Sequence, residues 1–144
     1  MILDNPVIGF RSFGEDKDKV TKFGLAYDEG MQDVGIMARA KHFPGHGDEA
    51  WIRTLIFLVI NKSIEQLDSL ELKPFKALFD AGVGSVMIAH LYIPAIDSTP
   101  NMATSLSKNA DRHCCEMIWG YNGLTFTDAL EMKGVAKYLA GVER

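Results

Sequence analysis

The sequence predicts an α/β fold with a parallel sheet. Segments of helical character alternate along the chain with short apolar segments of strand length. The strand candidates are mostly apolar rather than alternating, which is typical of parallel strands covered on both faces. Polar residues follow each of them. Functional residues at the carboxyl ends of parallel strands suit either a (β/α)8 barrel or an open doubly wound sheet.

Three helix-then-strand cycles follow one another. The helix candidates are residues 16–33, 62–82 and 105–123, and the strand candidates are residues 35–40, 83–90 and 124–130. The polar residues at the strand ends are Lys41, His42, His90, Thr127 and Asp128. Pro74 is expected to interrupt the second helix, because proline lacks the N–H of a helix interior. Ser105 or Ser107 is a possible cap of the third helix, which Gly120 and Gly123 are expected to end.

Composition indicates a soluble globular unit. The chain has 144 residues, of which 47% are hydrophobic, and a net charge of −4 that gives no electrostatic reason to expect nucleic acid. The apolar run at residues 55–60 is too short to span a bilayer, and no export signal is recognisable at the start. Cys114 and Cys115 are adjacent, so we expect reduced thiols rather than a strained mutual disulfide.

Four motifs carry a resemblance that covers nearly the whole chain. They are "NPVIGFRSFGED", "KHFPGHGD", "LKPFKALFDAGVGSVMIAHLYIPAID" and "GYNGLTFTDALEMKGV", in this order. Together they resemble the family 3 glycoside hydrolases, especially the bacterial β-N-acetylhexosaminidase branch. The resemblance implies a (β/α)8 barrel and retaining hydrolysis of a terminal β-linked sugar, commonly N-acetylglucosamine. It implies no metal or organic cofactor.

The resemblance also implies the length and extent of the domain. A barrel of this kind needs roughly 250 residues, and the motifs present belong to about the fourth through the seventh strand. We therefore expect residues 1–144 to be a single fragment of a catalytic barrel domain, a partial TIM barrel. The compartment of a full-length protein stays open between periplasm, secretion and cytoplasm.

The resemblance places four functional residues. Asp128 matches the family's nucleophile, which attacks the anomeric carbon to form a glycosyl-enzyme ester. Arg11, Lys41 and His42 match positions that bind the sugar hydroxyls, where charged donors can orient oxygen atoms. His90 and Met132 are expected to border the same pocket.

Each of these residues has a simpler interpretation. Asp128 could cap a helix that follows its strand, and Arg11 could be a solvated surface charge. His42 and His46 stand four apart, as zinc ligands on a helix do, but the Phe-Pro-Gly between them precludes a regular helix. We therefore expect no metal site.

The family's acid/base group is missing from its expected place. In the hexosaminidase branch the loop after "KHFPGHGD" carries Asp-Ser-His and ends in Pro-Val-Ile, and the His acts as general acid and base. Here Ile52 and Thr54, or their immediate neighbours, hold those places, and neither can shuttle a proton.

Two origins can explain the altered loop. Read from the third base of the Trp51 codon, suitable synonymous codons give Asp-Ser-His-Thr-Asp-Phe-Pro before Val59 and Ile60, so two compensating frameshifts could have changed the loop. Ordinary divergence to an inactive homologue is the alternative. The nucleotide sequence decides between them.

Two function classes stay open. The first is a β-N-acetylhexosaminidase-like or β-glucosidase-like hydrolase, and the second is a non-catalytic remnant that binds sugar or packs against another chain. The fragment alone is expected to be inactive.

Overall fold

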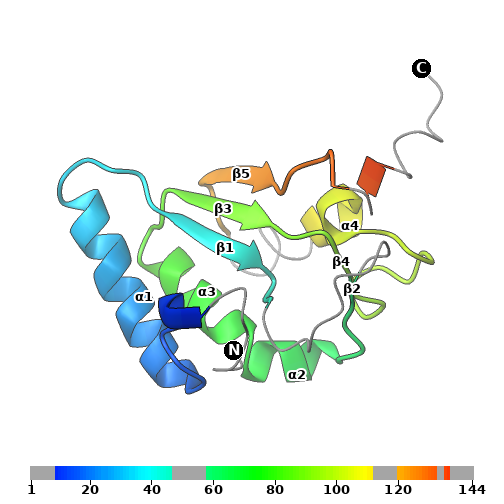
Figure 1. Ribbon diagram of the computed structural model, residues 1–144, viewed down its shortest axis with the longest axis horizontal. Helices are drawn as coiled ribbons and strands as arrows, with labels where there is room; N and C mark the ends of the chain where they lie inside the picture. Colours follow the sequence, from blue (N-terminus) through cyan, green and yellow to red (C-terminus); the bar gives the residue numbers. More distant parts are fainter. Residues whose placement is uncertain (1–8, 47–57, 112–119, 133–134, 137–144) are drawn as a thin grey trace.

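The computed structural model describes residues 9–46, 58–111, 120–132 and 135–136 (Figure 1). The helical elements are η1 (Gly9–Arg11), α1 (Lys17–Gln32), α2 (Ile64–Ser69), α3 (Leu72–Asp80), η2 (Thr104–Leu106) and α4 (Lys108–Asp111). The strands are β1 (Arg39–Phe43), β2 (Leu58–Val59), β3 (Ser85–Ile88), β4 (Leu91–Tyr92) and β5 (Leu124–Thr127). Cys114, Cys115, Ile52 and Thr54 lie outside the described residues.

The described strands form two parallel sheets. The main sheet has the order β1-β3-β5, and a two-stranded sheet pairs β2 with β4. The small sheet lies beyond the carboxyl ends of the main one (Figure 1). The predicted α/β class with parallel strands is thereby confirmed.

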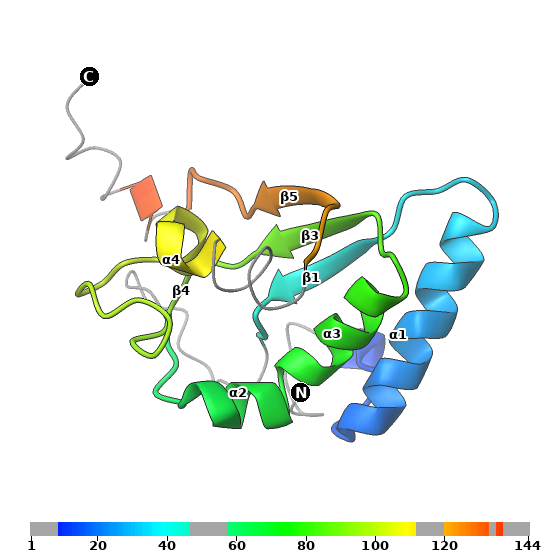
Figure 2. The same ribbon diagram turned by 180° about the vertical axis from the view of Figure 1, so that it is seen from behind.

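Helices cover one face of the main sheet. α3 packs against β1, and α1 packs against α3 on the same side, as both views show (Figures 1 and 2). The expectation that every strand is covered on both faces is wrong for β5, whose four residues are all exposed. β5 is an edge strand in the described part of the sheet, so only β3 shields it laterally.

α1 begins and ends where its terminal residues predict. The Asp16 carboxylate accepts a hydrogen bond from the Lys19 N–H and caps the first turn. Gly35 adopts a φ of 78°, and the Ile36 N–H donates to the Met31 carbonyl to close the last turn. Because this closure occupies residues 33–36, the strand expected at residues 35–40 begins later and includes Lys41 and His42.

The second helical segment breaks before Pro74, not at it. α2 starts with a capping box in which Ser63 and Gln66 satisfy each other's backbone N–H groups. It ends at Ser69, with Leu70 as its C-cap, and α3 then starts at Leu72. Pro74 is the third residue of α3, where the first-turn N–H groups have no partner within the helix, so its missing N–H costs nothing.

An aromatic cluster fills the space between the sheet and α3. Phe43 of β1 is 1% exposed and packs edge-on against Phe75 with ring centroids 5.2 Å apart. Phe79 stacks on Tyr121 at 4.5 Å. These contacts fix the carboxyl end of β1 against its helix.

The connection from β4 to α4 is held by short polar side chains. The Thr104 hydroxyl donates to the Ala89 carbonyl. Ser107, one of the two predicted caps, accepts from the Ala110 N–H and donates to the buried Asp97 carboxylate. Of the helix expected at residues 105–123, the described helical parts are the end of η2 and α4, whereas residues 120–123 are not helical. No described helix has the length and apolar character to span a membrane.

Candidate active site

The carboxyl end of β1 presents two consecutive polar side chains. The pairing with β3 runs Lys41 to Met87 and then Phe43 to Ile88, so His42 is an additional residue in the register. Ala40 and Phe43 both belong to the hydrophobic core. Two residues instead of one therefore stand between core positions, and both Lys41 and His42 can face the same cavity.

Asp128 follows β5 on the other side of β3. Its N–H donates to the Ile88 carbonyl at 3.0 Å, which continues the ladder one residue beyond the strand. Its Oδ1 accepts from the Ala129 N–H at 2.8 Å. Oδ2 lies 3.8 Å from Nε2 of His42. Parallel pairing through β3 thus brings together two residues that are far apart in the sequence.

His42 and Asp128 lie close together but do not form a hydrogen bond. A separation of 3.8 Å exceeds the usual hydrogen-bond range. Burial, and then the charge of Lys41, lower the pKa of His42, and the Asp128 carboxylate only partly opposes this shift. Near neutral pH His42 is therefore a neutral imidazole that can exchange hydrogen bonds with a hydroxyl group.

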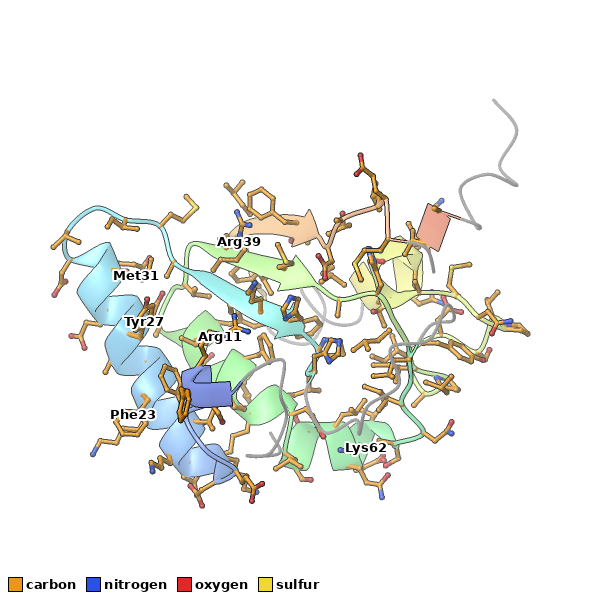
Figure 3. All side chains as sticks on the ribbon, viewed as in Figure 1. Arg11, Phe23, Tyr27, Met31, Arg39 and Lys62 are labelled. Carbon is orange, nitrogen blue, oxygen red and sulfur yellow. The ribbon has the colours of Figure 1, made fainter. Side chains whose placement is uncertain are left out.

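A cavity of about 860 Å³ runs along β1. Its lining includes Arg11, Lys41 and His42, three of the predicted site residues. In Figure 3 the Arg11 side chain extends from η1 toward β1. Asp128 does not line this cavity and meets it only through His42.

His90 and Met132, like Asp128, do not line this cavity, so their place beside a bound sugar stays a prediction. The His90 ring instead contacts Ser105 and the Ala129 carbonyl. Met132 is 49% exposed, in the turn after Asp128.

Several site residues had no recognisable signal in the sequence. Asp28 of α1 lines the cavity, is 4% exposed, and has a buried Oδ1 without a hydrogen-bond partner in the described structure. The Arg39 guanidinium lies 4.0 Å from the centre of the Phe126 ring, across β3. Lys62 and Glu71, which form an ion pair, also line the cavity. From the sequence alone, an acidic residue such as Asp28 in an amphipathic helix is predicted to lie on the solvent-exposed face, and only the packing shows that it is buried.

The two histidines of the "KHFPGHGD" motif contact each other outside a helix. The rings of His42 and His46 meet edge-on with centroids 5.8 Å apart. Phe43 ends β1 and Pro44 starts a turn, as the Phe-Pro-Gly sequence predicts. Within the described ranges, no group of three His, Cys, Asp or Glu side chains is placed to hold a metal ion.

Comparison with known proteins places the chain in a family. Residues 2–144 match the family model "Glycosyl hydrolase family 3 N terminal domain". The chain belongs to glycosyl hydrolase family 3. This confirms the resemblance carried by the four motifs.

Curated family 3 relatives are bacterial β-hexosaminidases. The β-hexosaminidase of Chromobacterium violaceum is 35% identical over 130 residues, which cover 90% of this chain and 36% of the relative. β-Hexosaminidase A of Pseudoalteromonas piscicida is 32% identical over 97% of this chain and 25% of its own length. The chain thus spans between a quarter and two fifths of these relatives.

Solved family 3 structures share the fold. CbsA from Thermotoga neapolitana has a TM-score of 0.80 and 33% identity over 89% of this chain and 29% of its own. The family 3 β-N-acetylglucosaminidase from Paenibacillus sp. FPU-7 has a TM-score of 0.79 and 38% identity over 93% and 25% of the two chains. NagZ from Neisseria gonorrhoeae has a TM-score of 0.75 and 29% identity over 94% and 40%.

Proposed function

We propose that the chain carries part of the active site of a retaining β-N-acetylhexosaminidase, with Asp128 as the nucleophile. The approach of Asp128 to His42, 3.8 Å across the ends of parallel strands, is the observation that carries the proposal. An ionised carboxylate in this place can attack an anomeric carbon. Names of the relatives, β-hexosaminidase and β-N-acetylglucosaminidase, support a terminal β-linked N-acetylglucosamine as the substrate.

Sugar binding is assigned to Arg11, Lys41 and His42. All three line the same cavity, which at about 860 Å³ has room for a sugar unit. Arg11 and Lys41 supply charged donors, and the neutral imidazole of His42 can donate and accept. Together they would orient the ring so that its anomeric carbon faces Asp128.

The fold is proposed to be a partial (β/α)8 barrel that contributes about strands 4 to 7, with residues 1–144 as one fragment of the catalytic domain. The order of the main sheet supports this proposal, because β1, β3 and β5 follow one another across the sheet in the same order as along the chain, while β2 and β4 belong to the second sheet. Consecutive barrel strands always neighbour each other, whereas an open doubly wound sheet reverses its order at a switch point.

The acid/base group is proposed to be lost from this chain, through frameshift or divergence. Its expected positions, Ile52 and Thr54, cannot transfer a proton. The codons at residues 51–58 distinguish the two origins, since codons incompatible with Asp-Ser-His in the displaced frame would exclude the frameshift.

The nucleophile can be tested without the missing acid. A dinitrophenolate leaves unprotonated, so the glycosyl-enzyme should form, and without a base to activate water it should accumulate. The chain would be mixed with dinitrophenyl N-acetylglucosaminide, alone and with the part of the Chromobacterium violaceum relative that it does not match. Peptide mass spectrometry should find one added sugar on the Asp128 peptide.

Substitution of the carboxylate provides the control. Asp128→Asn preserves shape and should abolish labelling in a chain of unchanged circular dichroism. Labelling that persists in Asp128→Asn, or that appears on another peptide, would refute the assignment.

A non-catalytic packing role is the second candidate, and an exposed aromatic cluster favours it. Phe13, Phe23 and Tyr27 are 41%, 44% and 65% exposed. The centre of the Phe13 ring lies 5.8 Å from that of Phe23 and 6.5 Å from that of Tyr27. Phe23 and Tyr27 both extend from α1 (Figure 3). Exposed apolar surfaces of this kind commonly mark contacts with other polypeptides. We expect the unmatched part of the relative to bind here, and Phe23→Ser with Tyr27→Ser to weaken that binding by at least tenfold in titration calorimetry.

A further inference from the structure

His90 links the ends of two strands through its imidazole ring. It follows β3, and its Nδ1 lies 2.6 Å from the Ser105 hydroxyl of η2. Its Nε2 lies 2.9 Å from the carbonyl oxygen of Ala129, the residue after Asp128. The ring therefore joins three segments that are well separated in the sequence.

The partners of the ring fix its tautomer. A carbonyl oxygen can only accept, so Nε2 must carry a proton and donate to Ala129. In the neutral ring Nδ1 then accepts, and the Ser105 hydroxyl donates to it. Both nitrogens are satisfied in this one orientation, so the ring cannot rotate without losing two hydrogen bonds.

Ala129 in turn holds the carboxylate of Asp128. The Ala129 N–H donates to Asp128 Oδ1 at 2.8 Å. The Ala129 carbonyl accepts from the Met132 N–H at 3.1 Å as well as from His90. Both lone pairs of this carbonyl are therefore used, and the backbone that aims the Asp128 side chain is anchored from two sides.

We propose that His90 is a positioning residue that orients the Asp128 carboxylate through Ala129, with Ser105 selecting the required tautomer of His90. This inference rests on the proposed role of Asp128 as nucleophile. His90 itself touches neither the cavity nor, in the described structure, the Asp128 carboxylate. Its effect is to keep Oδ1 bonded to the Ala129 N–H and thereby to leave Oδ2 on the His42 side.

A matched pair of serine variants tests the linkage in the chain as it stands. Ser105→Ala removes the hydroxyl that holds Nδ1 of His90. Ser107→Ala removes a nearby hydroxyl that caps α4 and contacts Asp97 instead. Amide exchange measured by NMR should be about fivefold faster at Ala129 in Ser105→Ala, the effect of one net hydrogen bond. It should be unchanged there in Ser107→Ala.

Two further measurements separate positioning from general support of the fold. Amides of β3, such as Val86, report global stability, so exchange that accelerates equally at Ala129 and Val86 would overturn the proposal. Nitrogen-15 shifts of the neutral ring should identify Nε2 as the protonated nitrogen of His90, and protonation at Nδ1 instead would also overturn it. His90→Gln, whose side-chain amide can donate to the Ala129 carbonyl, should keep exchange at the Ala129 amide as slow as in the unsubstituted chain. His90→Leu, which cannot donate, should make that exchange faster.

The labelling reaction connects the linkage to function. With dinitrophenyl N-acetylglucosaminide and the part of the Chromobacterium violaceum relative that the chain does not match, the sugar should attach to Asp128 several-fold more slowly in Ser105→Ala than in Ser107→Ala. Equal labelling rates, with selective loss of Ala129 protection, would refute the positioning role. An absence of label in every chain, the unsubstituted one included, would refute the nucleophile itself, while the exchange data would still report whether the linkage exists.

Discussion

At the scale of single residues, Asp28 is the clearest conflict between charge and burial. It lies on α1, is 4% exposed, and receives one hydrogen bond, from Gln32 to Oδ2. Its Oδ1 has no partner in the described structure. Burial therefore raises the pKa of this carboxyl group, and the bond from Gln32 only partly offsets that shift. The ionised form destabilises the folded state.

Asp28→Asn should stabilise the protein at neutral pH. A carboxyl group with a raised folded-state pKa contributes its full stability below the unfolded pKa of about 3.9, and this contribution is lost as pH rises through the folded value. The free energy of unfolding at pH 7 should thus increase by about 1 kcal/mol, the order of the cost of burying a polar group that lacks a hydrogen-bond partner. Urea titrations at pH 7 and at about pH 3.5 would measure it.

Glu29→Gln is the matched control for Asp28→Asn. It makes the same change of charge on the neighbouring, exposed position of α1 and should alter stability by less than about 0.5 kcal/mol. An equal gain from the two variants, or a gain from Asp28→Asn that persists at low pH, would contradict the burial argument.

At the scale of elements, the sequence indicated where two helices begin. A helix was expected from residue 16, where the Asp16 carboxylate caps α1, and Ser107, one of the two possible caps named, caps α4. The start of β1 was not predictable, because the apolar residues after Gly35 read as strand while the backbone there still closes α1. The position of the break between α2 and α3 was not predictable either, because proline is compatible both with the first turn of a helix and with a helix end.

The capping box of α2 should contribute measurably to stability. Ser63→Ala removes the acceptor of the Gln66 N–H and should lower the free energy of unfolding by about 1 kcal/mol. Ser69→Ala, at the other end of the same helix, deletes only a bond to the Gln66 carbonyl and should cost less. Urea denaturation of both would rank the two ends, and a larger loss at Ser69 would be inconsistent with capping.

The aromatic cluster of Phe13, Phe23 and Tyr27 should promote self-association. Replacing Phe23 and Tyr27 by lysine places charge on the exposed surface and should increase the monomer fraction several-fold in sedimentation velocity. Val34→Lys is the control, because Val34 is 70% exposed but lies outside the cluster. If Val34→Lys increases the monomer fraction as much as the lysines at Phe23 and Tyr27 do, then added surface charge, and not loss of the aromatic cluster, controls association.

At the scale of the whole molecule, strand polarity made part of the site predictable. Because β1 and β5 are parallel, the polar residues at their ends had to meet at one edge, which explains the proximity of His42 to Asp128. Their catalytic assignment came from the motifs, not from this geometry. The contacts of His90 and the burial of Asp28 could not be predicted, since they depend on how distant loops and helices pack.

The chain should not measurably hydrolyse a glycoside with a poor leaving group. General acid catalysis contributes about a hundredfold to ten-thousandfold, and the residues at the expected acid/base positions cannot provide it. A methyl N-acetylglucosaminide assayed by released sugar should give no signal above buffer. Turnover near that of an intact relative would mean that another group, such as His46, serves as the acid, and His46→Gln would then abolish it.

The additional residue in the register of β1 also decides which changes of length the strand tolerates. Side chains of a strand alternate between its faces, and the irregularity at His42 lets Ala40 and Phe43 both reach the core with two residues between them. Deleting either Lys41 or His42 would restore strict alternation, yet it would leave one polar side chain where the cavity now has two. Substitution of Lys41 or His42 changes the functional group that faces the cavity. Deletion of one codon would instead remove one of the two cavity-facing side chains, while the hydrophobic core stayed in register. The number of residues between Ala40 and Phe43 therefore sets how many polar side chains reach the cavity, whereas the hydrophobic core accepts either one or two.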